Sequence, residues 1–255
     1  MSDSPLKVWL DREGTLLRLR LARPKANIVD AAMIAALEGA LAEYREVKEL
    51  RAVLLDHEGP HFSFGASVDE HMPGQCDEML KSLHSLVRGM LNCPLPLLVS
   101  IKGQCLGGGL EVALAGSMLF AAPDAKLGQP EIKLAVFAPA ASCLLPERIG
   151  QAKAEDLLFS GRSMGADEAL ATGLIDSLAD DPEEAALAYF DKHLASHSPS
   201  TLRFAVVAAR HEYRQRMIAK LERVESLYLS ELMETHDAVE GLSAFLEKRP
   251  AKWDN

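Results

Sequence analysis

The amino-acid sequence predicts an α/β fold in which parallel sheets are covered by helices. Short apolar runs alternate with helical stripes along the first two thirds, and a triple glycine at 107–109 is suited to open one of these helices. The last third is almost wholly helical in pattern. At 255 residues the chain is long enough for one large α/β domain, or for one such domain with a smaller helical appendage.

The first elements are a predicted β-hairpin and a β–α–β unit. Residues 8–10 and 16–21 form two runs joined by a turn at 12–14, and leucine alternates with arginine in the second run, so we expect one buried face. Asp30 is a suitable N-cap for a helix with apolar residues at helical spacing, and the run 52–55 is short enough for a strand.

The same alternation repeats downstream. A helical stripe over 79–90 precedes a β-rich run at 97–101, and a helix from about 109 to 115 precedes a strand near 118–121. Residues 57–73 are rich in His, Gly and Pro and are expected to be irregular. Loops of this length are often functional.

The chain changes character after Arg162. A helix is expected at 166–170 and a short extended piece at 174–176. Further helices are expected at 203–210, 212–234 and 238–248. We place a boundary near Ser198, which separates a domain over 1–198 from a helical subdomain over 199–255, and we expect such an appendage to pack on a neighbouring subunit.

The charge and hydropathy of the chain exclude several classes of function. A net charge of −10 and a pI near 5.3 argue against a nucleic-acid partner and against an anionic membrane, since both need clustered Lys and Arg. No run of eighteen apolar residues exists and the amino terminus lacks the regions of a signal peptide, so we expect a cytoplasmic protein. The four cysteines are widely spaced, with no Cys-x-x-Cys pair, so neither a metal site nor a disulfide framework is expected.

The triple glycine does not fit a nucleotide-binding loop. A dinucleotide fingerprint needs glycine where Val112 stands, and a P-loop needs lysine where Leu110 stands. What remains is a tight turn that exposes backbone N–H groups at a helix N-terminus. Such a turn would stabilise a developing enolate oxygen.

Two glutamates near these glycines are candidates for an acid/base pair. Glu111 follows the glycines directly and Glu131 ends the segment Gly128-Gln129-Pro130-Glu131, twenty residues later. Glu111 is expected in the first helical turn, where the helix dipole favours an ionised carboxylate. If both carboxylates face one pocket, their repulsion raises the affinity of one for a proton, and Glu131 is the better candidate. Alone, a glutamate at a helix start is more often a solvated capping residue.

Six ordered segments, spread over nearly the whole chain, resemble those of the crotonase, or enoyl-CoA hydratase/isomerase, superfamily. They are 23–27, 62–67, 107–111, 128–131, 160–176 and 237–249. The resemblance implies a crotonase-type spiral of repeated ββα units, followed by a C-terminal helical trimerisation region. It also implies a homo-oligomer, either a trimer or a dimer of trimers, and an acyl-CoA thioester substrate whose CoA moiety leaves no need for a separate cofactor.

The resemblance also implies roles for particular residues. The thioester carbonyl oxygen would accept hydrogen bonds from the amides of Ala66 and Gly108. Glutamate at both acidic positions resembles hydratases rather than one-carboxylate isomerases, hydrolases or dehalogenases, so Glu111 would deprotonate water and Glu131 would deliver a proton to carbon. The first segment looks like the turn that contacts CoA, which makes three residues candidates there, although solvated charge is an alternative for the two cations: Arg23, Lys25 and Ala26.

Departures from the common pattern narrow the expected substrate. Ser67 stands where aspartate is usual, and a stretch with Phe137 and Ala138 replaces one that ends in Gly-Gly. These variants resemble the cyclohexa-1,5-diene-1-carbonyl-CoA hydratases of anaerobic benzoyl-CoA degradation, which implies a 6-hydroxycyclohex-1-ene-1-carbonyl-CoA product. A planar ring needs aromatic or small apolar walls, for which Phe64, Phe137 and Ala138 are candidates, although Phe137 is equally suited to the core. A generic short-chain enoyl-CoA hydratase is the alternative.

Two other classes of function remain open at this point. His61, Asp69 and His71 lie close together in the sequence and suggest a triad for thioester hydrolysis. Its nucleophile would be one of three residues: Ser67, Ser142 or Cys143. The second class is a catalytically silent, hydratase-like binding protein, against which the presence of both glutamates and both donor segments argues.

Overall fold

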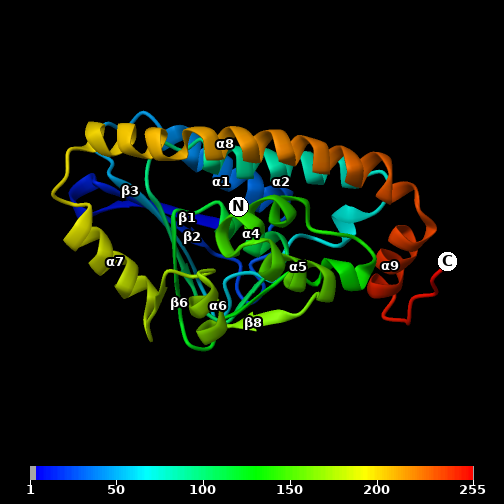
Figure 1. Ribbon diagram of the computed structural model, residues 1–255. Coiled ribbons are helices and arrows are strands. Elements are labelled where there is room, and N and C mark those ends of the chain that lie inside the picture. Colours follow the sequence, from blue (N-terminus) through cyan, green and yellow to red (C-terminus); the bar gives the residue numbers. More distant parts are fainter. Residues whose placement is uncertain (1–3, 255) are drawn as a thin grey trace.

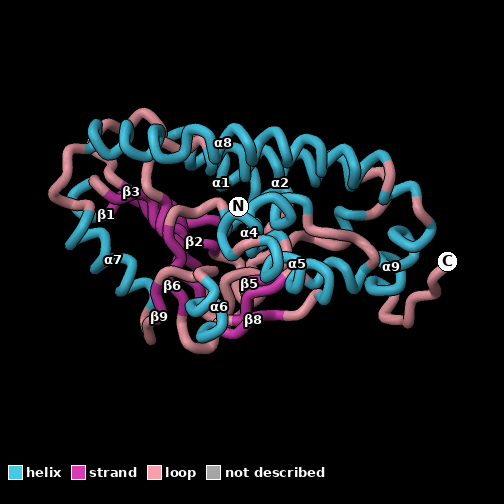
Figure 2. The backbone as a smooth tube through the Cα atoms, viewed as in Figure 1, coloured by secondary structure: helices cyan, strands magenta, loops and turns pink. Residues whose placement is uncertain are grey.

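A six-stranded sheet forms the centre of the computed structural model, which describes residues 4–254 (Figures 1 and 2). Its strand order is β1-β2-β3-β4-β6-β9, with β1 antiparallel to β2 and the other pairs parallel. The strands are β1 (Leu6–Asp11), β2 (Leu16–Leu21), β3 (Ala52–His57), β4 (Leu97–Ile101), β6 (Met118–Ala121) and β9 (Ser177–Leu178). A second sheet holds β5 (Gln104–Leu106), β7 (Lys126–Gly128) and β8 (Ser163–Gly165). The predicted α/β fold is therefore confirmed.

Helices cover both faces of the large sheet. The main core lies between one face and the helices α1 (Ala31–Tyr44) and α2 (Cys76–Leu91), and it includes Leu17, Leu19 and Leu21 of β2. A smaller cluster lies between the other face and α7 (Pro182–His193). Because successive side chains of a strand point to opposite faces of the sheet, adjacent residues of one strand pack into different clusters.

The predicted buried face of the hairpin is confirmed by Leu17, Leu19 and Leu21, and the opposite face of β2 is buried as well. Arg18 of β2 is only 3% exposed, because α7 covers this face as well. The Arg18 guanidinium pairs with Asp11 at 3.0 Å and also with Asp56 and Glu183. Carboxylates thus replace water around a charge that the alternating pattern had suggested would face solvent.

The C-terminal region is one long helix followed by a short one. The expected helices at 203–210 and 212–234 are a single helix, α8 (Pro199–Ser230), which Ser198 caps by accepting a hydrogen bond from the Thr201 amide. A turn (Leu232–Glu234) and α9 (His236–Leu246) follow. The position expected for the extended piece, 174–176, is wrong: strand β9 begins three residues later, at Ser177.

Helix α8 runs along the outside of α1 and α2, and α9 lies at its far end (Figure 1). Helix α8 packs on α2 and on α4 (Pro139–Ile149), and its residues Met217, Leu221 and Tyr228 belong to the main core. Two short helices, α5 (Gln151–Ser160) and α6 (Ala166–Thr172), complete the lower side. The division at residue 198 stays a prediction. Buried residues of the C-terminal helices belong to the same core as the sheet.

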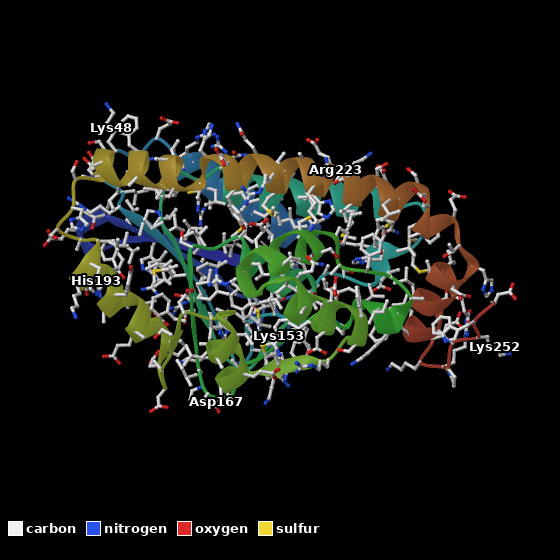
Figure 3. The ribbon with its side chains drawn as sticks, viewed as in Figure 1. Lys48, Lys153, Asp167, His193, Arg223 and Lys252 are labelled. Carbon is white, nitrogen blue, oxygen red and sulfur yellow. The ribbon has the colours of Figure 1, made fainter. Side chains whose placement is uncertain are left out.

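Polar side chains project from the edges of the molecule, among them Lys48, His193 and Lys252 (Figure 3). No helix within residues 4–254 is both long and apolar enough to cross a membrane. The same residues contain no group of three or more His, Cys, Asp or Glu side chains arranged to hold a metal ion.

Candidate active site

A cavity lies where the irregular segment 62–68 meets the start of helix α3 (Gly108–Leu114). It offers about 70 Å³ that the centre of a water molecule can occupy. Six parts of the chain contribute to its wall: segment 64–68, His71, α2, segment 107–111, the stretch 130–139 and α9. Apart from two glutamates and one histidine, the side chains on this wall are apolar.

Ala66 and Gly108 both line the cavity and lie against each other. Segment 62–66 runs beside β5, held by hydrogen bonds from Ser63 N to Gln104 O and from Leu106 N to Ser63 O, each 3.0 Å. Gly108 is the first residue of α3, so its N–H has no acceptor one turn earlier in the helix. A β carbon on Gly108 would stand 3.0 Å from the Ala66 nitrogen. The two amides predicted to bind an oxyanion are thus neighbours.

Glu111 lies in the first turn of α3, as expected, and is only 3% exposed. The expectation that its surroundings favour the ionised carboxylate is wrong, because burial disfavours the charged form. Its Oε1 accepts a 2.9 Å hydrogen bond from the Ala141 amide, in the first turn of α4. Burial raises the pKa of Glu111 above its ordinary value, and the charge of His84 and the amides of Ala141 and Ala140 offset this effect only in part. The carboxylate therefore caps a neighbouring helix while facing the cavity.

Glu131 faces the same cavity from the short helical turn Pro130–Leu134. Its Oε1 packs against Gly107, where a β carbon would approach to 2.7 Å, and its Oε2 is buried without a hydrogen-bond partner among the described residues. Burial, together with the charge of Glu111, raises the pKa of Glu131 to about 8. This direction agrees with the expectation that Glu131 is the protonated member of the pair.

The three predicted wall residues, Phe64, Phe137 and Ala138, all line the cavity. The ring of Phe137 meets that of Tyr228 edge-on, with centroids 5.2 Å apart, so Phe137 joins the cavity to the core. Sequence reasoning missed three further wall residues on distant helices: Leu80, Leu83 and Leu242. Their local pattern is that of ordinary core residues, so no signal in the sequence distinguishes them.

The predicted CoA-contacting residues and Ser67 are not part of the cavity wall. Ala26 lies nearby, because its carbonyl accepts a 2.9 Å hydrogen bond from the Phe64 amide. Arg23 pairs with Asp30, the cap of α1, and Lys25 is exposed without an ion pair among residues 4–254. The carbonyl of Ser67 accepts a hydrogen bond from His71.

The residues of the alternative triad do not form one. His71 Nδ1 donates to the Ser67 carbonyl at 2.7 Å, and His61 Nδ1 accepts from the Gln104 amide at 3.2 Å, so neither of these two nitrogens binds Asp69. The Ser142 hydroxyl donates to the Ala138 carbonyl. Burial raises the pKa of the Cys143 thiol to about 12, which disfavours a thiolate nucleophile. The geometry does not support a hydrolase triad.

The family model for enoyl-CoA hydratase/isomerase matches residues 11–255, which include both glutamates and both predicted amide donors. The chain belongs to this family. Among enoyl-CoA hydratase/isomerase relatives, the cyclohexa-1,5-dienecarbonyl-CoA hydratase of Thauera aromatica is 70% identical over 254 residues, covering 100% of this chain and 98% of the relative. A probable enoyl-CoA hydratase of Bacillus subtilis (strain 168) is 34% identical over 241 residues, covering 91% of this chain and 92% of the relative.

Solved structures of the enoyl-CoA hydratase/isomerase family share the fold. A crystal structure from Pseudoalteromonas atlantica T6c superimposes with a TM-score of 0.86 at 27% identity, covering 98% of this chain and all of the other. An enoyl-CoA hydratase from Bacillus halodurans gives a TM-score of 0.87 at 20% identity, covering 94% of this chain and all of the other. The predicted crotonase-type fold, with its helical C-terminal region, is thereby confirmed.

Proposed function

We propose that this protein is a hydro-lyase that adds water to cyclohexa-1,5-diene-1-carbonyl-CoA and forms 6-hydroxycyclohex-1-ene-1-carbonyl-CoA. The observation that carries this proposal is the 70% identity, over the full chain, to the hydratase of Thauera aromatica. At the level of the site, support comes from two glutamates that face one small cavity beside two adjacent backbone amides.

The proposed oxyanion hole consists of the Ala66 and Gly108 amides. The thioester carbonyl oxygen accepts a hydrogen bond from each of these N–H groups. The two hydrogen bonds stabilise the negative charge that develops on this oxygen when water attacks the conjugated system. Removal of one such donor typically costs about 100- to 1,000-fold in rate. Because the donors are backbone groups, their positions depend on segment 62–66 and on the absence of a side chain at Gly108.

In the proposed mechanism the two glutamates divide the proton transfers. Glu111 takes one proton from water while the oxygen bonds to the β carbon, and the electron pair of the double bond moves into a dienolate whose charge reaches the γ carbon. Glu131 then gives its proton to the γ carbon. Each transfer contributes on the order of 100- to 10,000-fold to the rate. A pKa of about 8 keeps Glu131 largely protonated at neutral pH, as an acid requires.

The size and lining of the cavity suit a compact ring. A site for one water molecule needs roughly 10–15 Å³ of this kind of space. The 70 Å³ present therefore corresponds to about five such sites. Phe64, Phe137 and Ala138 supply flat or small apolar walls. For the CoA portion, we propose that Lys25 contacts a phosphate, since its turn adjoins Phe64 through the Ala26 carbonyl.

The proposal is tested by following the hydration of cyclohexa-1,5-diene-1-carbonyl-CoA spectrophotometrically, beside crotonyl-CoA. We expect a clear preference for the cyclic substrate. A preference for crotonyl-CoA would contradict the proposed substrate while leaving the hydratase chemistry intact. Hydrolysis to free CoA without a hydrated product would contradict the reaction class.

We also propose that the protein forms a trimer or a dimer of trimers through its C-terminal region. The amino-terminal half of α8 exposes apolar side chains: Phe204 is 76% exposed and Val207 is 38% exposed. Large apolar side chains on a helix are normally covered, so a second copy of the chain is a suitable partner for them. Native mass spectrometry is expected to show three or six subunits, and a monomer at micromolar concentration would contradict this part.

A further inference from the structure

The side chain of Ser63 lies between the two segments that carry the proposed oxyanion donors. Ser63 is fully buried and is not part of the cavity wall. Its Oγ accepts a 3.1 Å hydrogen bond from the Gly65 amide. Ser63 also packs against Gly109, where an added β carbon would stand 2.6 Å from the same oxygen. The hydroxyl therefore lies against the residue before one donor, Ala66, and the residue after the other, Gly108.

The backbone of Ser63 holds this hydroxyl in a fixed place. Its N–H and C=O groups both pair with strand β5, through Gln104 O and Leu106 N at 3.0 Å each. Strand β5 leads through Gly107 directly into α3, whose first residue is Gly108. Ser63 is thus anchored to the stretch of chain that carries the second donor.

Hydrogen bonds fix the orientation of the peptide unit that joins Gly65 to Ala66. Gly65 has a φ of +112°, in a region that glycine enters readily, so local backbone preference alone does not fix this unit. The Gly65 carbonyl accepts a 2.9 Å hydrogen bond from the Val29 amide, while its N–H donates to Ser63. Because the C=O and N–H groups of a trans peptide unit point in opposite directions, the Ala66 N–H points away from Val29. This N–H has no acceptor among residues 4–254 and is available to a ligand.

Resting on the proposed function, we propose that Ser63 is a positioning residue, whose hydroxyl holds the Ala66 amide beside the Gly108 amide for the oxyanion. The hydroxyl restrains Gly65 at its N–H, and Val29 restrains it at its C=O. Without the hydroxyl, the buried Gly65 N–H would lack an acceptor, and the donor peptide would keep only the hydrogen bond from Val29. A displacement of about 1 Å in a reacting group can cost on the order of 100-fold in rate.

The test compares Ser63→Ala with the wild type in the hydration of the cyclic dienoyl-CoA. An oxyanion donor acts more strongly in the transition state than in the bound substrate. We therefore expect kcat to fall by about 10- to 100-fold. The dissociation constant of benzoyl-CoA, a planar thioester whose aromatic ring is not hydrated, is expected to change little.

The matched control is Ser117→Ala, which removes the same kind of hydrogen bond away from the cavity. The Leu97 amide donates to Ser117 Oγ at 2.9 Å, and Ser117 is not part of the cavity wall. This variant is expected to lose stability, as Ser63→Ala does, but to keep the wild-type kcat. Equal losses of kcat in the two variants would show a general effect on the fold and would overturn the inference.

The carbonyl stretch of bound benzoyl-CoA gives a readout that loosened packing alone does not change. Two N–H donors lower this frequency in the wild type, which infrared difference spectroscopy with a ¹³C-labelled carbonyl measures. We expect a smaller shift in Ser63→Ala and the wild-type shift in Ser117→Ala. A folded Ser63→Ala variant with the wild-type carbonyl frequency would overturn the inference, whatever its rate.

If Ser63→Ala does not fold, a crystal structure of the wild type with benzoyl-CoA decides. The carbonyl oxygen is expected on the Ala66 and Gly108 amides, with the Ser63 hydroxyl on the Gly65 amide. A hydroxyl turned away from Gly65 would overturn the inference alone. A carbonyl oxygen away from both amides would contradict the proposed oxyanion hole and the inference with it, so the two failures are distinguishable.

Discussion

The Ala66 amide nitrogen lies 3.0 Å from the point where a β carbon on Gly108 would stand. A side chain at residue 108 would therefore press on the Ala66 backbone, beside the proposed oxyanion hole. Gly108→Ala is expected to lower kcat by about 100- to 1,000-fold, as for the loss of one oxyanion donor, with the fold retained.

The matched control for this substitution is Gly39→Ala in α1, where nothing lies within 4 Å of the added methyl group. It is expected to keep full activity and to stabilise the protein by roughly 0.5–1 kcal/mol, since glycine weakens helix interiors. Steady-state kinetics and thermal unfolding of both variants provide the measurements. Near-native turnover of Gly108→Ala would show that the carbonyl oxygen binds elsewhere.

The pH dependence of hydration reports on Glu131. The folded protein raises the pKa of this carboxyl group to about 8, and the proposed acid works only when protonated. We therefore expect kcat to be sustained up to neutral pH and to fall as the pH rises through about 8. A kcat that is constant to pH 10, measured where the enzyme remains folded, would show that a group other than Glu131 donates the proton to the substrate.

The buried ion cluster of the hairpin is expected to dominate stability far from the site. Asp56 is 1% exposed and pairs with Arg18 and Arg20, so Asp56→Ala leaves buried guanidinium charge without its main partner. We expect a loss of about 3–5 kcal/mol in the free energy of unfolding, measured with denaturant. Asp191→Ala breaks a surface pair with Arg12 and should cost less than about 1 kcal/mol. Equal effects of the two substitutions would contradict this ranking.

Tyr228 provides a stability test beside the cavity. Its side chain is 1% exposed and its hydroxyl has no hydrogen-bond partner among the described residues. Tyr228→Phe keeps the ring against Phe137 and removes an unpaired polar group, so we expect the free energy of unfolding to rise by about 1 kcal/mol. A clear decrease in the unfolding temperature would indicate that the hydroxyl has a partner in solution.

The sequence predicts well those features that depend on neighbouring residues. Asp30 caps α1 as expected, and the runs at 97–101 and 118–121 are strands, because capping and apolar spacing are local properties. The split expected inside α8 is wrong for a local reason as well: no glycine or proline lies between Pro199 and Ser230, so nothing interrupts the helix.

Features that depend on packing between distant elements were not predictable. The burial of Arg18 requires Glu183, which lies on a helix more than 160 residues later. The hydrogen bond from Ala141 to Glu111 joins two helices, and Leu242 reaches the cavity from α9. The motifs identified the two glutamates and the two amides, whereas the residues that support and enclose them could be found only in three dimensions.

The central claim is that two carboxyl groups share one hydration reaction, and single-turnover hydration of cyclohexa-1,5-diene-1-carbonyl-CoA tests it most directly. Glu111→Gln keeps an oxygen that can accept from the Ala141 amide, and Glu131→Gln keeps the size of its side chain. Each variant is predicted to lose about 100-fold or more in the rate constant while binding the substrate nearly as tightly as the wild type. A near-native rate constant in either variant would contradict the two-carboxylate mechanism.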